Sequence, residues 1–376
     1  MTIGILREPS FETRVSLLPE HISVLKKQNI RVLVESKCGN TAFASDAQYE
    51  KEGAEISSRE NILRACDILL SIHHLTEDDM QYVKNASVIL GVYNPLAQAS
   101  LIKEWAIKGL TTFSMDMLPR TTRAQSMDVL SSQANIAGYK AVLLAAMQLP
   151  KYFPMFMTAA GSIAPAKVLI LGAGVAGLQA IATAKRLGAV VEVFDTRAAV
   201  KEEVMSLGAK FVEVEGASDA SNAGGYAVDQ TEEYKQKQQQ RIAEVAAKAD
   251  VIITTAQIPG KKAPILLSDT VLDSMKTGSL IIDLASATGG NTSKTKDKET
   301  VVYKNVTIIG NSNLQSTMPA DASKLYGKNI LNFLRLITGT EGQINLNFDD
   351  NLVKGACITY NGEISNVRVK EVLNNN

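Results

Sequence analysis

Three glycines in the middle of the chain have the spacing of a dinucleotide-binding turn. Gly172, Gly174 and Gly177 form the pattern G-x-G-x-x-G within "KVLILGAGVAGLQAIATAKRLGAVVEVFD", directly after an apolar run and directly before a helical pattern. At such a turn the first glycine allows the tight bend, the second lets the backbone approach a pyrophosphate, and the third lets helix and strand pack closely. The start of the helix adds free N–H groups and the positive end of its dipole. We therefore predict that this strand–turn–helix unit binds a dinucleotide.

An acidic residue at the end of the next apolar run indicates which dinucleotide is bound. Asp195 lies 18 residues after Gly177. A carboxylate in this place accepts hydrogen bonds from a ribose diol and repels a 2′-phosphate, which favours NAD(H) over NADP(H). Arg197 follows two residues later, and it could either meet a phosphate or form a salt bridge at the surface. The salt bridge is favoured while Asp195 is present.

A second stretch, "PRTTRAQSMDVLSSQAN" at residues 119–135, is polar but nearly free of charge. From Ala124 to Tyr139 its only charged side chain is Asp128. On a regular helix Gln125, Asp128 and Ser132 fall within about 60° of one another. This face could line a water-filled crevice between domains, or it could hold an amide-bearing ligand such as a nicotinamide carboxamide, which needs both a donor and an acceptor.

Groups that could act as a general base are scarce. A dehydrogenase that oxidises an alcohol or amine needs such a base, usually His or Lys. We expect His21 on an exposed helix face, while His73 and His74 follow the strand-like run "DILLSI" and could form either a base or part of a surface loop. Hydride transfer between two nicotinamide rings needs no proton at the reacting carbons, so the protein has only to align the rings and exclude water.

Composition excludes several classes of protein. The chain has 376 residues, and its 39 basic and 39 acidic residues give a net charge of zero, so nucleic acid is a poor candidate as partner. Three widely spaced cysteines favour a reducing compartment over a disulfide framework or a zinc site. The N-terminus lacks the pattern of a signal peptide. The longest charge-free apolar run, Val168–Ala184, is broken by glycines, so we expect no membrane span.

Short apolar runs alternate with helical patterns in two series, which is typical of βαβ units and parallel sheets. The first series fills the first third of the chain, the second starts at Lys167, and helical stretches at about 136–153 and 320–338 flank the second. We therefore predict an α/β fold with two Rossmann-like, doubly wound parallel-sheet domains separated by a cleft, the second inserted into the first. The first domain is expected at 1–137 and 325–376, and the NAD(H)-binding domain at 138–324.

Two loops have distinctive sequences. Asn361-Gly362 lies between strand-like residues and predicts a tight hairpin. Gly216–Gln240 is rich in small and polar residues before it turns helical. It could be a plain surface loop or a mobile flap over a site, since long loops in compact domains are often functional.

Several blocks of the sequence together resemble a known family over about residues 3–362. They are "RAQSMDVLSSQANIAGYKAVLLAA", "MTAAGSIAPAKVLILGAGVAGLQAIATAKRLGAVVEVFD", "AGGY", "ITTAQIPGKKAP", "IIDLA", "GGN", "ADAS" and "NILNFL". The family is the NAD(H)-binding domain I, or alpha subunit, of proton-translocating NAD(P) transhydrogenase of the Si/Re-specific type. Alanine dehydrogenase shares the fold and part of the sequence.

The resemblance implies partners as well as an activity. Domain I forms a homodimer, binds NAD(H) and faces a separate NADP(H)-binding domain III, while a membrane domain II couples hydride transfer to proton movement. The implied location is the cytoplasmic side of the inner membrane, reached through these partner subunits. Because the chain stops at Asn376 without a membrane part, we expect a separate subunit or a shortened chain.

The resemblance also implies roles for particular residues. The nicotinamide end is expected to be held by Arg120, Gln125, Asp128 and Ser131, where the helical wheel instead selects Ser132. A flap that closes on the nucleotide maps around Gly224–Tyr226. The full set of expected cofactor contacts is Gly172, Ala173, Gly174, Val175, Gly177, Asp195, Thr196, Arg197, Gly225, Tyr226 and Ala256.

Some positions depart from the family pattern. Ala287 stands where members commonly carry an acid, and "GNSNLQSTMPADAS" is looser than usual. The stretches "SIHHL" and "GVYNPLA" lack the lysine and the histidine of alanine dehydrogenase, which counts against amino-acid oxidation. Two alternatives stay open: an alanine-dehydrogenase-like enzyme with His73 or His74 as base, and an NAD(H) sensor without catalysis.

Overall fold

The computed structural model describes residues 1–214, 231–258 and 260–374. The chain divides into two compact units, the first formed by Met1–Gln133 and Ser316–Asn376 and the second by Ala134–Gln315. The second unit is thus an insertion in the first along the chain. The first junction lies four residues and the second nine residues before the position expected from the sequence, so that the whole of helix α10 (Pro319–Ile337) belongs to the first unit.

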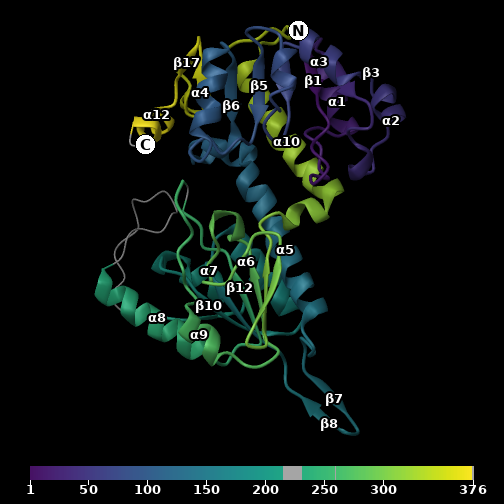
Figure 1. The fold of residues 1–376 in the computed structure, drawn as a ribbon. Coiled ribbons are helices and arrows are strands. Elements are labelled where there is room, and N and C mark those ends of the chain that lie inside the picture. The colour runs from purple at the N-terminus through teal and green to yellow at the C-terminus, as the bar shows by residue number, and fades with distance from the viewer. Residues whose placement is uncertain (215–230, 259, 375–376) are drawn as a thin grey trace. The chain divides into compact units, whose positions relative to one another are not determined.

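The first unit contains an eight-stranded sheet in the order β17-β16-β6-β5-β4-β1-β2-β3 (Figure 1). Neighbouring strands from β3 to β6 run parallel, whereas β16 and β17 add an antiparallel edge. The strands are β1 (Thr2–Ile5), β2 (Arg31–Glu35), β3 (Glu55–Ser57), β4 (Ile68–Leu70), β5 (Val88–Gly91), β6 (Thr111–Ser114), β16 (Cys357–Tyr360) and β17 (Glu363–Ile364). The α-helices besides α10 are α1 (Pro19–Lys26), α2 (Asp46–Lys51), α3 (Arg59–Ala65), α4 (Ala99–Ile107), α11 (Asn351–Ala356) and α12 (Val367–Asn374).

Both faces of this sheet are buried. Within β4, Ile68 and Leu70 pack into a core shared with α1 and α10, while Leu69 between them packs into a core shared with α3 and α4. This explains why the strands read as unbroken apolar runs. The expected hairpin is also present: Asn361 and Gly362 have φ values of 50° and 81°, which a tight two-residue turn requires.

The second unit contains a seven-stranded sheet in the order β11-β10-β9-β12-β13-β15-β14, parallel except for the edge strand β14. Its strands are β9 (Lys167–Leu171), β10 (Val190–Phe194), β11 (Lys210–Phe211), β12 (Val251–Thr254), β13 (Leu280–Asp283), β14 (Thr300–Tyr303) and β15 (Val306–Gly310). Its helices are α6 (Val175–Arg186), α7 (Lys201–Ser206), α8 (Glu232–Ala246), α9 (Asp269–Ser274) and most of α5 (Val129–Gln148). Helices α5, α6 and α7 cover one face, and α8 and α9 cover the other.

The α/β fold and the parallel sheets expected from the sequence are confirmed, but some elements were not anticipated. The short edge strands β3 and β14 and the separate hairpin of β7 (Phe156–Thr158) and β8 (Gly161–Ile163) are the main examples. All six residues of β7 and β8 are exposed. An exposed strand shows neither a buried apolar run nor a clear alternation, so pattern analysis passes over it.

The expectation that His21 is exposed is wrong. Its side chain is buried in the first unit, where its Nδ1 accepts a hydrogen bond of 3.0 Å from the backbone N–H of Leu18. A Cβ on Gly327 of α10 would lie 2.3 Å from the imidazole, so this glycine makes room for the ring. His21 shares the buried face of α1 with Ile22 and Leu25. Burial lowers the pKa of His21 to about 4.

We predict that replacing His21 with asparagine costs less stability at pH 5 than at pH 7.5. The folded-state pKa lies below the ordinary value of 6.5, so the folded protein resists a proton that the unfolded chain binds. The contribution of neutral His21 is therefore complete above pH 6.5 and is lost as the pH falls towards 4. The destabilisation caused by the variant should shrink by about 2 kcal/mol between the two pH values.

The measurement is urea unfolding of both proteins, followed by emission of the single tryptophan, Trp105, which is buried in the same unit. Glu8, whose pKa burial raises to about 7, acts in the opposite sense as the pH falls, but it is present in both proteins and cancels in the difference. An equal destabilisation at both pH values would contradict the prediction.

Candidate functional site

The glycine pattern forms a tight turn between β9 and α6 in the second unit. Gly172 has a φ of 105°, and α6 begins directly after Gly174. A Cβ on Gly177 would lie 1.9 Å from the carbonyl oxygen of Gly172, which only the close packing of helix on strand explains. A Cβ on Gly174 would have no atom within 4 Å. The space at Gly174 and the unpaired N–H groups expected at the start of α6 suit an approaching pyrophosphate.

Asp195 follows β10 and joins this turn to the next loop. Its Oδ2 accepts hydrogen bonds from Ala173 N at 2.7 Å and Arg197 Nη2 at 2.7 Å, and its Oδ1 accepts from Arg197 N at 2.8 Å and Nε at 2.9 Å. Arg197 therefore forms the salt bridge that the sequence favoured, and this pairing raises the pKa of its guanidinium. A carboxylate has about four acceptor positions. A ribose that binds Asp195 must therefore displace part of the Arg197 contact.

The loop after β12 is held by residues that sequence reasoning did not select. Asn291 is fully buried, accepts a hydrogen bond from Ala256 N at 3.1 Å and donates to Ala256 O and Pro264 O at 2.9 Å each. Asp283, at the end of β13, accepts from Asn291 N at 2.7 Å and from Thr295 Oγ1 at 2.6 Å. Asp283 belongs to the sequence block "IIDLA" and Asn291 to "GGN". The residues next to them in the chain do not indicate which groups they contact.

Three further positions named from the sequence can be located in the structure, whereas the flap cannot. Val175 is the first residue of α6, and Thr196 stands between Asp195 and Arg197. Ala287 is exposed on a short 3-10 helix, Ser286–Thr288, where a larger acid would also fit. The proposed flap, including Gly225 and Tyr226, lies outside the described residues.

In the first unit, Asp128 interrupts the segment that was expected to be one helix. A 3-10 helix, η4 (Thr122–Met127), ends at Asp128, whose φ of −76° and ψ of 90° leave the helical path, and α5 begins at Val129. The carboxylate of Asp128 accepts hydrogen bonds from Ser131 N at 2.9 Å and Ser131 Oγ at 2.6 Å. This is the side-chain cap of a helix N-terminus.

The helical-wheel grouping of Gln125, Asp128 and Ser132 is therefore wrong. A capping residue cannot belong to the helix that it starts, so the two sides of Asp128 have different helical phases. The structure pairs Asp128 with Ser131, the serine selected by the family resemblance, and turns Ser132 towards Asn329. Gln125 and Arg120 are exposed.

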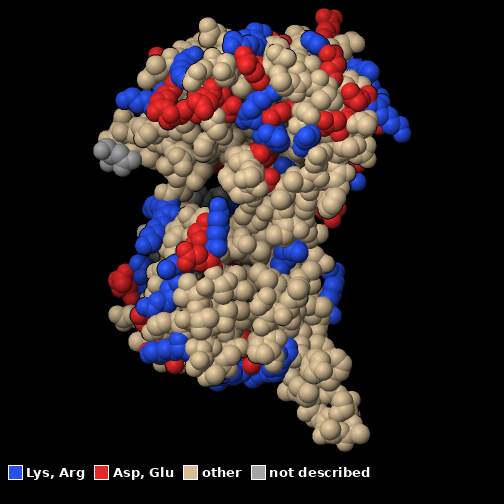
Figure 2. Space-filling model, turned by 45° about the vertical axis from the view of Figure 1, so that its right-hand side comes forward, with Lys and Arg blue, Asp and Glu red and all other residues tan. Residues whose placement is uncertain are grey.

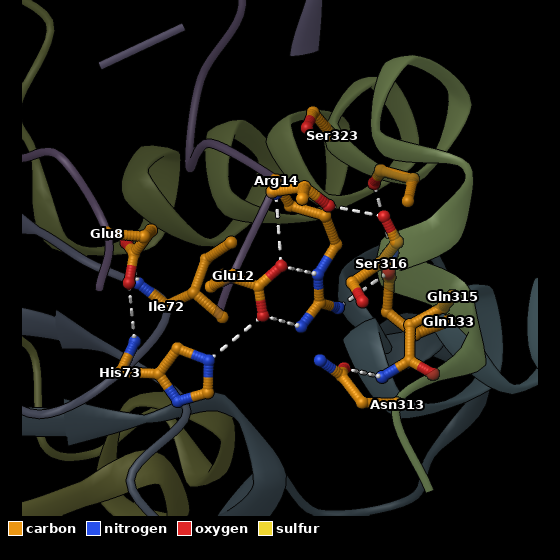
Figure 3. A network of polar contacts seen from close by, with 12 residues as sticks. Glu8, Glu12, Arg14, Ile72, His73, Gln133, Asn313, Gln315, Ser316 and Ser323 are labelled. Atoms are coloured by element: carbon orange, nitrogen blue, oxygen red, sulfur yellow. Dashed lines mark hydrogen bonds and ion pairs between the residues drawn. The ribbon is translucent and has the colours of Figure 1, made fainter. Parts of the chain in front are cut away.

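A buried charged cluster lies at the ends of β1 and β4, which are neighbours in the first sheet (Figure 3). Glu8 accepts hydrogen bonds from Ile72 N at 2.6 Å and His73 N at 3.1 Å, and burial raises the pKa of Glu8 to about 7. Glu12 pairs with Arg14 Nη2 at 2.7 Å and His73 Nε2 at 2.9 Å. Burial alone would raise the pKa of Glu12, but the bonds from Arg14 and His73 outweigh it and lower this pKa to about 2.

This cluster places His73 in a different environment from His74. The His73 ring is half-buried and stands edge-on to Phe11, with ring centroids 5.1 Å apart. His74 is exposed, and its Nδ1 lies 3.3 Å from the carbonyl oxygen of Leu75. Of the two histidines considered as a base, only His73 has a carboxylate that orients it.

The described part of the chain contains no cluster of possible metal ligands and no exposed cysteine. No group of three or more His, Cys, Asp or Glu side chains there could hold a metal ion. All three cysteines are buried, and burial raises the pKa of each thiol.

None of the described helices has the length and apolar character needed to cross a membrane.

Two family models match consecutive parts of the chain. The family model for the alanine dehydrogenase/PNT N-terminal domain matches residues 4–137, and that for the C-terminal domain matches residues 141–367. A protein of Rickettsia prowazekii (strain Madrid E) that is named as an alpha subunit of NAD(P) transhydrogenase is 44% identical over 365 residues, which cover 96% of this chain and 94% of that protein.

Solved structures give the same result. A transhydrogenase from Sinorhizobium meliloti matches with a TM-score of 0.88 and 40% identity, covering 97% of this chain and all of that one. An L-alanine dehydrogenase matches with a TM-score of 0.82 at 21% identity, over 100% of this chain and 99% of that one, which shows a shared fold. The chain belongs to the alanine dehydrogenase/PNT family, and within it the chain is more similar to transhydrogenase alpha subunits than to alanine dehydrogenase.

Proposed function

We propose that this chain binds NAD(H) and passes hydride between NADH and NADP⁺ held by a partner subunit, as part of a proton-translocating NAD(P) transhydrogenase of the Si/Re-specific type. The observation that carries the proposal is segment 120–131, in which Asp128 is the only acidic side chain. It presents an exposed amide at Gln125 beside an Asp128–Ser131 pair whose hydrogen bonds already fix its geometry. Such groups orient a ligand without exchanging a proton with it. The similarity to an alpha subunit over 96% of the chain supports the same function.

NAD(H) fits the loops at the carboxyl ends of β9, β10 and β12. NADH supplies the hydride, and the residues of this chain bind and orient the nucleotide. The backbone between Gly172 and Gly177 receives the pyrophosphate at the space beside Gly174. Asp195 receives the adenosine ribose, and Ala256 lines the nucleotide from the loop that Asn291 holds.

The nicotinamide end is assigned to four residues of segment 120–131. Gln125 offers both a donor and an acceptor to the carboxamide. Asp128 and Ser131 hold each other, so little side-chain freedom is lost when a ligand binds. Arg120 supplies a positive charge. We assign two further parts of the enzyme to partner subunits: an NADP(H)-binding domain III and a membrane domain II. These partners would hold this chain at the cytoplasmic side of the inner membrane.

The β7–β8 hairpin is the surface that we assign to homodimer formation. Tyr152, Met155, Phe156, Met157 and Ile163 in and beside it are between 42% and 77% exposed. Residues 152–166 contain no charged side chain, and the hairpin forms an uncharged projection in the space-filling view (Figure 2). An isolated two-stranded hairpin is marginally stable in water, and exposed apolar patches of this kind mark interfaces. A second copy of the chain would cover it.

The His73–Glu12 pair is the observation that favours a second function, an alanine-dehydrogenase-like oxidation with His73 as base. Incubation of the chain with NADH, pyruvate and ammonium separates the two functions. Steady loss of NADH in this mixture would establish the second function, whereas we expect none. A pure NAD(H) sensor would show neither this activity nor hydride exchange with a partner.

We predict that Gln125→Ala and Asp128→Ala slow hydride transfer more than they weaken NADH binding. Both groups are assigned to the ring, where misalignment costs rate, and not to the remainder of the nucleotide. Transfer should fall about tenfold or more, with the Kd for NADH changed by less than about threefold. Transfer is measured with a partner subunit carrying NADPH and an NAD⁺ analogue of distinct absorbance. Gln81→Ala, at an exposed position of the 3-10 helix Asp79–Gln81, is the matched control, and unchanged transfer in both Gln125→Ala and Asp128→Ala would refute the assignment.

Opposite changes in nucleotide preference are expected at Asp195 and Arg197. Asp195→Asn removes the charge that repels a 2′-phosphate, so the preference for NADH over NADPH should narrow by about tenfold. Arg197→Ala removes the adjacent positive charge, so the preference should widen. Fluorescence titration of both nucleotides measures the two affinities. If Asp195→Asn keeps the original preference, another group discriminates between the nucleotides.

We also predict that Met157→Asp shifts the chain from dimer towards monomer. A charge on the hairpin would have to be buried without a partner, which costs several kcal/mol. Val302→Asp is the control, since Val302 is similarly exposed at 68% on the edge strand β14 of the same unit. Sedimentation measures the mass of each protein. A dimer that persists in Met157→Asp would place the interface elsewhere.

A further inference from the structure

The carbonyl oxygen of Ser126 is satisfied by side chains from a distant helix. Ser126 lies near the end of η4, and the backbone leaves the helical path two residues later at Asp128. The last carbonyls of a helix have no helical donors. Asn329 Nδ2 and Asn332 Nδ2, one turn apart on α10, both donate to Ser126 O, at 2.9 Å and 3.0 Å.

Asn329 reaches both sides of the break at Asp128. Since a carbonyl oxygen can only accept, the Asn329 amide must turn its NH₂ to Ser126, which leaves its Oδ1 to accept from Ser132 Oγ at 2.7 Å. One side chain thus joins the end of η4 to the first turn of α5. Asn329 is 7% exposed, so its own amide is shielded from water and depends on these two partners within the protein.

A second bond anchors the start of α5 to the same helix. Gln133 Nε2 donates to Ala322 O of α10 at 3.1 Å, and Gln133 Oε1 accepts from Arg14 Nη1 at 2.8 Å. Through these bonds α10 holds Ser126, two residues before Asp128, and also Ser132 and Gln133 after it. A rotation of the backbone at Asp128 would require several of these hydrogen bonds to open together.

We propose that Asn329 is a positioning residue that sets the angle between η4 and α5, and so the relative placement of Gln125, Asp128 and Ser131. Asn332 adds a second donor to the same carbonyl but is half-exposed, and its Oδ1 accepts from Arg335 of α10 itself at 3.4 Å. The part of this inference that concerns ligand alignment rests on the proposed function. The part that concerns the backbone of residues 119–133 does not.

Asn329→Asp tests the inference with almost no change of shape. The carboxylate can still accept from Ser132, but its second oxygen faces the Ser126 carbonyl and repels it. Asn332→Asp is the matched control, because it makes the same chemical change at the half-exposed donor. Ser132→Ala removes the hydrogen bond from Ser132 to Asn329, together with the local bond from Ser132 to Val129 O, and leaves the bond from Asn329 to Ser126 intact. It replaces Asn329→Asp as the test variant if that protein fails to fold, which Trp105 emission reports.

Hydrogen exchange read by mass spectrometry on peptides spanning residues 119–133 gives the first measurement. We expect faster exchange in Asn329→Asp and in Ser132→Ala than in the wild type or Asn332→Asp. The second measurement is hydride transfer with the partner subunit, which should fall about 10- to 100-fold in Asn329→Asp while the Kd for NADH changes by less than about threefold. A residue that only stabilised the fold would not separate rate from affinity.

Lowering the pH provides a rescue. Once protonated, the carboxyl group introduced by Asn329→Asp again presents a donor to Ser126, so the transfer rate of this variant relative to the wild type should recover between pH 8 and pH 5.5. Exchange and transfer at wild-type values in Asn329→Asp would overturn the inference, as would equal effects in Asn332→Asp. If the wild type itself transfers no hydride, the proposed function fails, and the exchange measurement alone then decides the positioning role.

Discussion

Parallel strands that are buried on both faces leave their carboxyl ends as the place where polar groups of the backbone can meet a ligand. In the second unit this constraint gathers the turn after β9, Asp195 after β10, Ala256 after β12 and Asp283 at the end of β13. Hydrogen bonds then join these loops in pairs, from Asp195 to Ala173 and from Asn291 to Ala256. The shape that suits a dinucleotide is therefore a property of four strand ends held together, and the three glycines contribute the space and the turn.

In the first unit, polar side chains are held in place by hydrogen bonds along a stretch, residues 124–133, whose only charged side chain is Asp128. Segment 120–131 changes direction at Asp128, and a change of direction exposes backbone groups that need partners. Asp128 satisfies the start of α5, and asparagines of α10 satisfy the end of η4. Amides and hydroxyls can do this at a modest desolvation cost, whereas lysines and glutamates could not be buried unpaired. This explains a stretch rich in Gln, Ser and Asn with a single acid.

Within the buried cluster formed by Glu8, Glu12, Arg14 and His73, the pKa values of the two glutamates are shifted in opposite directions. Glu12 is stabilised as a carboxylate by Arg14 and His73, while burial favours protonated Glu8 a few residues away. The cluster binds the loops after β1 and β4 together through Ile72 and His73. Arg14 is committed to Glu12 and Gln133, so its charge is already neutralised within the chain.

The sequence by itself determined the features that depend on neighbouring residues. Apolar runs marked the main strands, glycine spacing and Asp195 marked the dinucleotide turn, and Asn361-Gly362 marked a hairpin, because period and turn chemistry are local properties. Only the tertiary structure decided that His21 is buried against Gly327, that Asp128 breaks the helix, and that Asn329 lies against Ser132, 197 residues away. A polar side chain at such a site has no distinctive neighbours in the sequence. Its partner is chosen by the packing of α10 on η4 and α5, and that packing exists only in the folded unit.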